Sequence, residues 1–257
     1  MLTRRKLETG SPKVTQGTPT PAQETASAFR PSGVDVAITT REGPSLRSLS
    51  MMLLLLFAVV IAWPMSMSVV REATWPIRLA VHLSPFVVIL GALVAAARLE
   101  GQHVATVLGW STEHLGRQVI IGLGLVMVTL SLTLFPALLG FSVLGEGETR
   151  PLVFLYVAVR TFLLVGFVEE FAWRGYVLGG AKRALGSAPW AVVVSSALFG
   201  LWHFPGGHSI VQVVVTAFIG AIYATARLKV RHCSTLATGI AHGSHDLALL
   251  VLATLSA

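Results

Sequence analysis

Three ionisable residues, Glu169, Glu170 and Arg174, stand inside a strongly apolar stretch that reads LLVGFVEEFAWRGYVLGG. A charged side chain at the centre of a bilayer costs roughly 2.5–3.5 kcal/mol, so ionisable residues at that depth usually have a function. Each helical residue turns by about 100°, so Glu170 and Arg174 share a face and can pair, whereas Glu169 points about 100° away from Glu170. This spacing fits a purely structural ion pair, but it also leaves Glu169 free to act as a base.

Two further apolar stretches carry polar side chains at helical spacing. The stretch ALFGLWHF places Phe199 and His203 four residues apart, and TGIAHGSHDLALL does the same for His242 and Asp246. Residues four apart lie on one face of a helix. Taken singly, a histidine near a helix end is often only a satisfied interfacial residue, and a buried His with Asp can be a hydrogen bond between helices.

Taken together, Glu169, His203, His242 and Asp246 supply two carboxylates and two imidazoles from three separate apolar segments. This set can activate a water molecule and stabilise a developing oxyanion. Two histidines and a carboxylate are also a common zinc-ligand set. The spacing therefore leaves two hypotheses open: a metal-independent site, and a divalent metal such as zinc held by His203, His242 and Asp246.

The elements that must position these residues are predicted to be membrane-spanning helices. Hydrophobic residues make up 54% of the 257 residues and charged residues only 12%, against about 25% charged in soluble domains. About 20 apolar residues let a helix cross the hydrocarbon, and a helix satisfies its own backbone groups there. We expect an all-α, polytopic bundle of about 7–8 spans, seven of which lie near residues 49–70, 77–97, 118–141, 152–180, 188–204, 210–226 and 234–254.

The chain divides by composition into two parts. Residues 1–47 are rich in Pro, Thr, Ser and Gly and cannot bury enough apolar surface to fold, so we predict a disordered polar N-terminal tail. Residues 48–257 form the predicted transmembrane domain, with the polar motifs in 152–254. The net charge of +7 does not come from basic clusters interleaved with aromatic residues, so we expect no nucleic-acid partner.

The distribution of basic residues predicts the orientation of the chain. The tail holds seven Lys and Arg, and seven more flank the predicted loops on the same side, against three on the other side. By the positive-inside rule the N-terminus is expected in the cytoplasm. The seven basic loop residues are Arg98, Arg117, Lys182, Arg183, Arg227, Lys229 and Arg231, and the opposing three are Arg71, Arg78 and Arg150.

The long fourth run raises a question of depth. If its span began at residue 152, Glu169 and His203 would lie at different depths in a core of about 30 Å. A span starting near Arg160 puts Glu169 near the midplane, with the Arg160 side chain reaching the outer interface. We therefore expect residues 150–159 to be a loop, an interfacial helix or an outward extension of the span.

The order EExxxR, then FxxxH, then HxxxD, each in an apolar segment, resembles the CPBP family of intramembrane proteases. This family includes the type II CAAX prenyl endopeptidases and bacteriocin-processing or self-immunity proteins. The resemblance covers roughly residues 152–254. The sequence contains no HExxH, GxGD or GxSG, which other types of intramembrane protease carry.

The resemblance implies an intramembrane endopeptidase whose buried site opens toward the cytoplasm and cleaves membrane-associated or prenylated (CAAX-type) substrates. Glu169 would activate the water, and His203, His242 and Asp246 would bind it and stabilise the transition state, with Glu170, Arg174 and Phe199 in support. The expected partners are a peptide or lipidated protein and the lipid bilayer, and the expected location is a bacterial inner membrane. Family members are described both as metalloproteases and as metal-independent. A proton-coupled transporter and a non-catalytic immunity or scaffold protein on the same fold are the alternatives.

Overall fold

The structure is a computed structural model that describes residues 44–141, 144–145, 147–207 and 209–257, and these residues form helices and loops without a β-strand. Nearly all of the predicted tail, residues 1–43, lies outside the described residues. The helices are α2 (Leu46–Val69), α3 (Trp75–Leu99), α4 (Val104–Leu108), α5 (Leu115–Leu138), α6 (Pro151–Val159), η1 (Arg160–Val165), α7 (Gly166–Glu170), η2 (Phe171–Val177), α8 (Leu178–Leu185), α9 (Ala188–Trp202), α10 (Phe204–Gly207), α11 (Ile210–Lys229) and α12 (Thr235–Leu255).

The predicted all-α membrane fold is confirmed. Six helices among the described residues are long and apolar enough to cross a bilayer, and each matches one of the predicted runs. The seventh predicted run is helix α9, which has only 15 residues and spans about 22 Å. Large apolar side chains such as Leu54, Val87 and Ile120 are exposed along the helices, as expected for surfaces that face lipid. The chain is an integral membrane protein.

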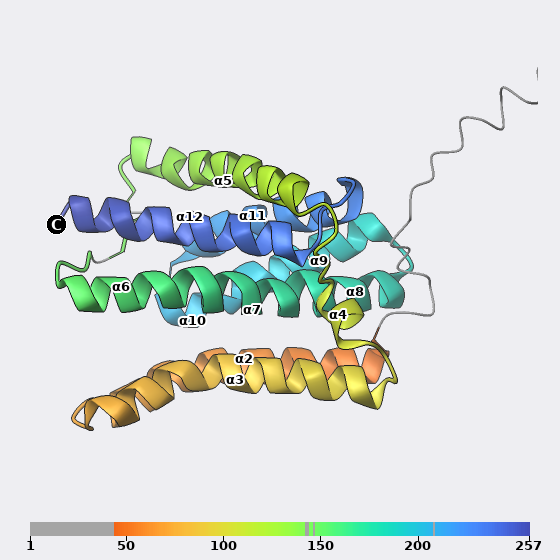
Figure 1. Ribbon diagram of the computed structural model, residues 1–257, viewed down its shortest axis with the longest axis horizontal. Coiled ribbons are helices and arrows are strands. Elements are labelled where there is room, and N and C mark those ends of the chain that lie inside the picture. Colours follow the sequence, from red (N-terminus) through yellow and green to blue (C-terminus); the bar gives the residue numbers. More distant parts are fainter. Residues whose placement is uncertain (1–43, 142–143, 146, 208) are drawn as a thin grey trace, which may run out of the picture. The chain divides into compact units, whose positions relative to one another are not determined.

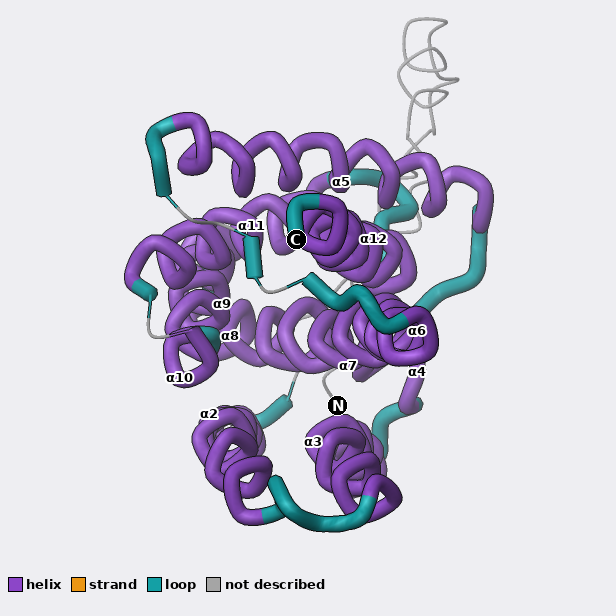
Figure 2. Tube along the Cα trace, turned by 90° about the vertical axis from the view of Figure 1, so that its left-hand side faces the viewer, coloured by secondary structure: helices purple, strands orange, loops and turns teal. Residues whose placement is uncertain are grey.

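The helices form a bundle in which α12 has a central place. It packs against α5 on one side and against α7 and η1 on the other, while α9 packs against α11 and α8. Figure 2 shows α2 and α3 as a pair on one side of this group and α5 on the opposite side. Four helices begin at a serine whose side chain accepts a hydrogen bond from a backbone N–H in the first turn, which fixes these starts locally. These serines are Ser45, Ser187, Ser209 and Ser234.

The fourth span is one continuous helix of 35 residues, Pro151–Leu185, in which the π-helical segments η1 and η2 flank α7. Figure 1 shows it running the full length of the bundle beside α12. A Cβ atom added to Gly166 would lie 2.6 Å from the Cα of Gly243, so only glycine allows this approach of α7 to α12. The close approach brings the carboxylates of α7 next to the polar residues of α12.

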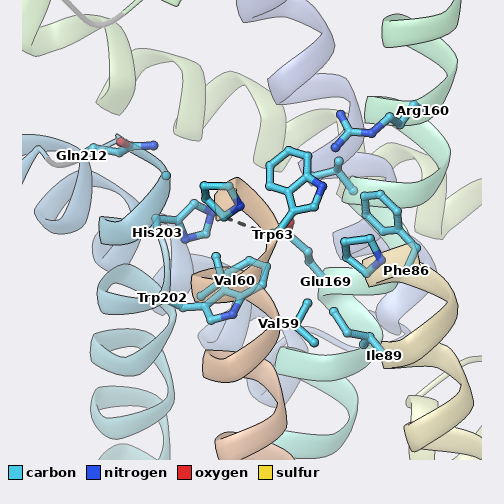
Figure 3. A pocket seen from close by; sticks show the side chains of 14 residues that line it. Val59, Val60, Trp63, Phe86, Ile89, Arg160, Glu169, Trp202, His203 and Gln212 are labelled. Carbon is cyan, nitrogen blue, oxygen red and sulfur yellow. Dashed lines mark ion pairs between the residues drawn. The ribbon is translucent and has the colours of Figure 1, made fainter. Parts of the chain in front are cut away.

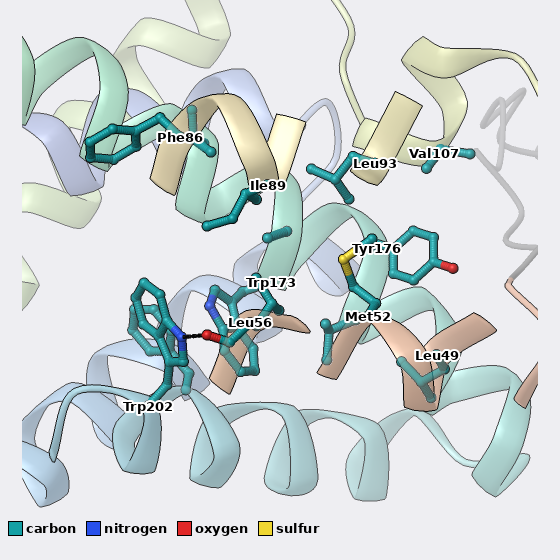
Figure 4. Packing of buried hydrophobic residues seen from close by; sticks show 14 of the residues in the cluster. Leu49, Met52, Leu56, Phe86, Ile89, Leu93, Val107, Trp173, Tyr176 and Trp202 are labelled. Atoms are coloured by element: carbon teal, nitrogen blue, oxygen red, sulfur yellow. Dashed lines mark hydrogen bonds between the residues drawn. The ribbon is translucent and has the colours of Figure 1, made fainter. Parts of the chain in front are cut away.

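The largest apolar core joins α2 and α3 to the long helix and α9. Leu56 of α2 and Trp173 of η2 are completely buried, and Trp202 of α9 donates its indole N–H to the Leu56 carbonyl oxygen at 2.8 Å. Figure 4 shows these side chains packed in one cluster. The hydrogen bond ties α9 to α2, so the end of α9 is held in place next to the long helix.

Glu169 and His203 lie at similar distances from the turn between α8 and α9. Glu169 lies 16 residues before Leu185, about 24 Å along the helix, and His203 lies 15 residues after Ala188, about 22 Å. The two residues are therefore level. Residues 151–159 are the outward extension of the span that was one of the predicted possibilities. The guanidinium of Arg160 lies over the rings of Trp63 and Phe86, and its expected reach to the interface stays a prediction.

Candidate active site

The carboxylate of Glu169 is buried in the bundle and faces two histidines. Its Oε2 atom lies 3.8 Å from Nε2 of His203 and 3.9 Å from Nε2 of His242, and it accepts no hydrogen bond within the described structure. These separations exceed a direct hydrogen bond and suit a single bridging water molecule. The three groups thus converge on one point from α7, α9 and α12.

Glu170, one residue later, has a different environment. It is completely buried, and its Oε1 atom lies 3.1 Å from the guanidinium of Arg174 and 3.1 Å from Nδ1 of His242. The Arg174 guanidinium also stacks 4.1 Å from the centre of the Phe199 ring. A buried carboxylate needs such partners, because an unpaired charge is costly away from water. Glu170 therefore links the arginine of its own helix to the histidine of α12.

His203 closes the end of α9. Its Nδ1 atom lies 2.8 Å from the carbonyl oxygen of Phe199, and its ring packs edge to face on the Phe199 ring with centroids 4.6 Å apart. A carbonyl oxygen can only accept, so Nδ1 carries the proton of this hydrogen bond. The neutral ring then presents the lone pair of Nε2 toward Glu169. The FxxxH spacing thus positions and orients the imidazole.

His242 lies among three carboxylates. Its Nδ1 atom faces Glu170, and its Nε2 atom lies 3.5 Å from Oδ2 of Asp246 and 3.9 Å from Glu169. The contact with Asp246 is the one that the four-residue spacing predicted. When both neighbouring groups are ionised they only accept hydrogen bonds, so both ring nitrogens of His242 face acceptors.

The structure brings together all four residues predicted to carry chemistry, and Glu170, Arg174 and Phe199 pack directly behind them. Their catalytic roles stay predictions. His245 is separate, since its ring hydrogen-bonds Thr129 and Thr133 of α5 at 3.1 and 3.3 Å. The contact between Glu170 and His242 was not predicted from the sequence. The GIAHG pattern at Gly239 and Gly243 could have indicated it, because small residues four apart favour close helix packing.

Two cavities meet at this cluster. The first, of about 180 Å³, is mostly apolar and is drawn in Figure 3; the second, of about 460 Å³, contains most of the polar groups. His203 and Gln212 line both cavities, while Glu169 lines the first and His242 and Asp246 the second. The reacting groups therefore lie on the boundary between an apolar and a polar space.

Both cavities lie toward the end of the bundle that is away from the α8–α9 turn. The polar cavity is lined by Thr133 near the end of α5, Gln212 near the start of α11 and Leu249 in the last third of α12. In Figure 1 this is the end where α12 reaches the C-terminus and α6 begins. The basic residues Lys182, Arg183 and Lys229 lie at the other end.

The sequence left open a divalent metal held by His203, His242 and Asp246. Within the described residues no group of three or more His, Cys, Asp or Glu side chains is arranged to hold a metal ion. Nε2 of His242 lies 3.5 Å from Asp246 and 3.9 Å from Glu169. The donor types suit zinc, whereas their arrangement does not, so the metal stays a prediction.

Comparisons with known proteins bear on residues 151–248. This segment matches the family model described as Type II CAAX prenyl endopeptidase Rce1-like. The match contains all three motifs and confirms the resemblance drawn from them. Searches of the curated proteins and of the solved structures each found no match. Residues 151–248 are therefore similar to the Rce1-like family of type II CAAX prenyl endopeptidases.

Proposed function

We propose that this protein is an intramembrane endopeptidase that hydrolyses peptide bonds of membrane-associated or prenylated substrates with a water molecule activated by Glu169. The match of residues 151–248 to the family model supports the reaction class. The mechanism rests on one observation: a buried carboxylate oxygen without a hydrogen-bond partner faces two imidazole nitrogens at distances that one water molecule bridges. The family match does not favour a transporter.

The two histidines have different roles in this mechanism. His203 donates from Nδ1 to the Phe199 carbonyl, so its neutral Nε2 accepts a hydrogen bond from the water and orients it. His242 acts as an imidazolium, because both of its nitrogens face carboxylate acceptors, Glu170 and Asp246. Its Nε2–H is then available to the oxyanion that develops on the substrate.

The reaction proceeds in two steps. Glu169 takes one proton as the water oxygen bonds to the scissile carbonyl carbon, and the negative charge moves to the carbonyl oxygen next to His242. The C–N bond then breaks, and Glu169 returns the proton to the leaving amine. The products are a new carboxyl terminus and a free amine, and Glu169 is again ionised.

Asp246 has a positioning role in this proposal. An ionised Asp cannot donate to an oxyanion, but its contact at 3.5 Å holds the His242 ring from the side opposite Glu170. A divalent metal on His203, His242 and Asp246 remains the other hypothesis, and no step above depends on it. Metal analysis of the purified protein together with a chelator assay separates the two: full activity of metal-free protein would exclude the metal.

The proposed orientation follows from the basic residues. With the N-terminus and the basic loops in the cytoplasm of a bacterial inner membrane, both cavities lie toward the outer half of the bilayer. This differs from the cytoplasm-facing site that the family resemblance implied. Single cysteines introduced at Gly145 and Gly186, which lie at opposite ends of the bundle, allow a test with a membrane-impermeant thiol reagent in spheroplasts. Labelling at residue 186 alone would show that the orientation is opposite to the proposed one.

The decisive experiment measures cleavage of membrane peptides by the wild type and by Glu169→Gln. We expect kcat to fall by about 10²–10⁴-fold, because a general base contributes that much. Glu148→Gln is the matched control. Hydrogen bonds from Arg150 hold the pKa of Glu148 at about 2, so it is also an ionised glutamate, but it lies in the loop between α5 and α6 and pairs with Arg150, not with a residue of the cluster. Full activity of Glu169→Gln would refute the mechanism.

A further inference from the structure

Gln212 is a neutral polar residue near the proposed reacting groups, and the reaction above gives it no role. It stands in the first turn of α11, 17 residues before Lys229, or about 25 Å along the helix. This places it roughly level with Glu169 and His203, which lie at similar distances from the same end of the bundle. Polar side chains at such a depth in a membrane are costly and usually have a function.

The side chain of Gln212 lies where the two cavities meet. Like His203, it lines both of them, and Figure 3 shows it on the side of His203 opposite Glu169. Glu169 lines only the first cavity, and His242 only the second. A peptide whose scissile bond lies between Glu169 and His242 must cross the same boundary, so a neighbouring peptide group of that substrate passes Gln212.

The side-chain amide of Gln212 has free donors and a free acceptor. Among the described residues its hydrogen bonds use only its backbone, whose N–H donates to Oγ of Ser209 at 3.3 Å and whose carbonyl oxygen accepts from the Thr216 hydroxyl at 2.7 Å. The hydroxyl groups that line the polar cavity, those of Thr133, Ser209 and Thr216, each have a partner within the protein. Gln212 is also the only carboxamide among the described residues that line either cavity.

A carboxamide carries the same hydrogen-bonding groups as a peptide bond. It has a carbonyl acceptor and N–H donors and carries no charge, so it can accept from the N–H of one peptide group and donate to a main-chain carbonyl. A peptide backbone that leaves water must find partners for these groups, because unpaired ones are costly in an apolar space. Gln212 is therefore suited to bind the main chain of a substrate, whatever its side chains.

Gly207, the last residue of α10, leaves room for this amide. A Cβ atom added to Gly207 would overlap Oε1 of Gln212, so any other residue would displace the end of the Gln212 side chain. Gly207 also lines the polar cavity. The turn between α9 and α11 thus keeps open the space that the Gln212 amide occupies.

On the basis of the proposed hydrolase function, we propose that the side-chain amide of Gln212 binds a main-chain peptide group of the substrate next to the scissile bond. It accepts a hydrogen bond from the N–H of that group and holds the chain across the boundary between the two cavities. Gln212 is a substrate-binding residue in this proposal, since it contacts the substrate but not the reacting atoms.

The test uses the full-length protein in neutral detergent with one prenylated CAAX-type peptide and a series of analogues, each with one main-chain N–H replaced by an ester oxygen. For the wild type, we expect one analogue with the ester next to the scissile bond to lower kcat/KM about 3- to 10-fold, chiefly through KM, because one neutral hydrogen bond is lost. Gln212→Ala should lower the value for the peptide by the same factor and leave that analogue unchanged. An equal loss on the peptide and on every analogue in Gln212→Ala would overturn the proposal, as would a wild type that no ester affects.

Gly207→Ala tests the position of the amide without removing it. The added methyl group should displace the Gln212 side chain and lower kcat/KM for the peptide as Gln212→Ala does. The control is the double variant with Gln212→Ala, in which Gly207→Ala should cause no further fall because the amide is already absent. Wild-type kinetics in the single Gly207→Ala variant would overturn the placement of the amide.

A binding measurement separates this proposal from the hydrolase itself. Glu169→Gln is titrated with the same peptide and esters, and binding is followed by the shift in melting temperature. Tighter binding of the peptide than of one ester, with the difference lost when Gln212→Ala is added, supports the site even if no cleavage occurs. Equal binding of the peptide and all esters by Glu169→Gln refutes it.

Discussion

The segment 151–248 and the helix pair α2–α3 line the same apolar cavity, but they contribute different kinds of side chain. The first supplies the ionisable groups Arg160, Glu169 and His203, whereas the second supplies apolar and aromatic walls such as Trp63 and Phe86. Only the first matches the family model. Under the proposed function, the reacting groups would lie in the family segment, while the preceding helices would shape the space that the substrate enters.

The largest effect on kcat is expected for a residue of the proposed site, His203, which lies in the segment 151–248. His203→Ala removes the ring that orients the water and should lower kcat by about 10²–10⁴-fold. Its Phe199 carbonyl partner is on the same helix, so the fold should persist. Initial rates of peptide cleavage and a thermal unfolding curve in detergent check both statements. If the variant kept the wild-type kcat, the proposed role of His203 in orienting the water would be refuted.

A second prediction concerns the buried ion pair in the same segment. Glu170→Gln leaves Arg174 as an uncompensated buried charge and should destabilise the protein by about 3–5 kcal/mol. The control is the double variant Glu170→Met with Arg174→Leu, which removes both charges and should recover most of the stability without recovering activity. Unfolding in increasing denaturant gives the values. An unchanged Glu170→Gln variant would mean that the pair contributes nothing to the architecture.

The glycine contact between α7 and α12 allows a smaller, geometric test. Gly166→Ala places a Cβ atom 2.6 Å from the backbone of Gly243, so the helices must move apart, at a cost of about 1–3 kcal/mol. Activity should fall too, since Glu170 would move away from His242. Gly124→Ala is the matched control: no atom lies within 4 Å of the added Cβ, and stability should stay equal or rise slightly. If both variants lose stability to the same extent, the contact has no special role.

The smallest effect is expected in the cavity wall contributed by α2. Trp63→Ala enlarges the apolar cavity without touching Glu169 or the histidines, so KM should rise several-fold while kcat stays constant. Steady-state kinetics over a range of substrate concentrations separates the two constants. A fall in kcat at unchanged KM would contradict the division of roles between the two regions.

The local parts of this architecture could be predicted from the sequence. Apolar runs fixed the helices to within a few residues, and helical rotation separated Glu169 from the Glu170–Arg174 pair. Which helices pack together could not be deduced in the same way, so the contact between Glu170 and His242 was missed. It depends on Gly166 meeting Gly243, two residues far apart in the chain.

The neighbours of Arg160 could not be predicted for a related physical reason. The span was assumed to start near Arg160, with its side chain reaching the outer interface. A π-helical segment, which no spacing of apolar residues reveals, instead turns it into the cavity beside Glu169. The depth of the site was likewise left open, because the sequence did not decide between a loop, an interfacial helix and the outward extension that gives the helix its 35 residues.

The shortness of α9 has a consequence for the supply of water. The helix ends at Trp202, about 22 Å from its start, so the backbone has a non-helical turn at His203, before the short helix α10, within the depth of a core of about 30 Å. Such backbone is tolerated in a membrane only beside protein or a hydrated space. Hydrolysis would consume one water per turnover, and the polar cavity that His203 lines is the space through which that water would reach the proposed site. The turnover rate should therefore depend on bilayer thickness, with longer lipid acyl chains slowing the enzyme.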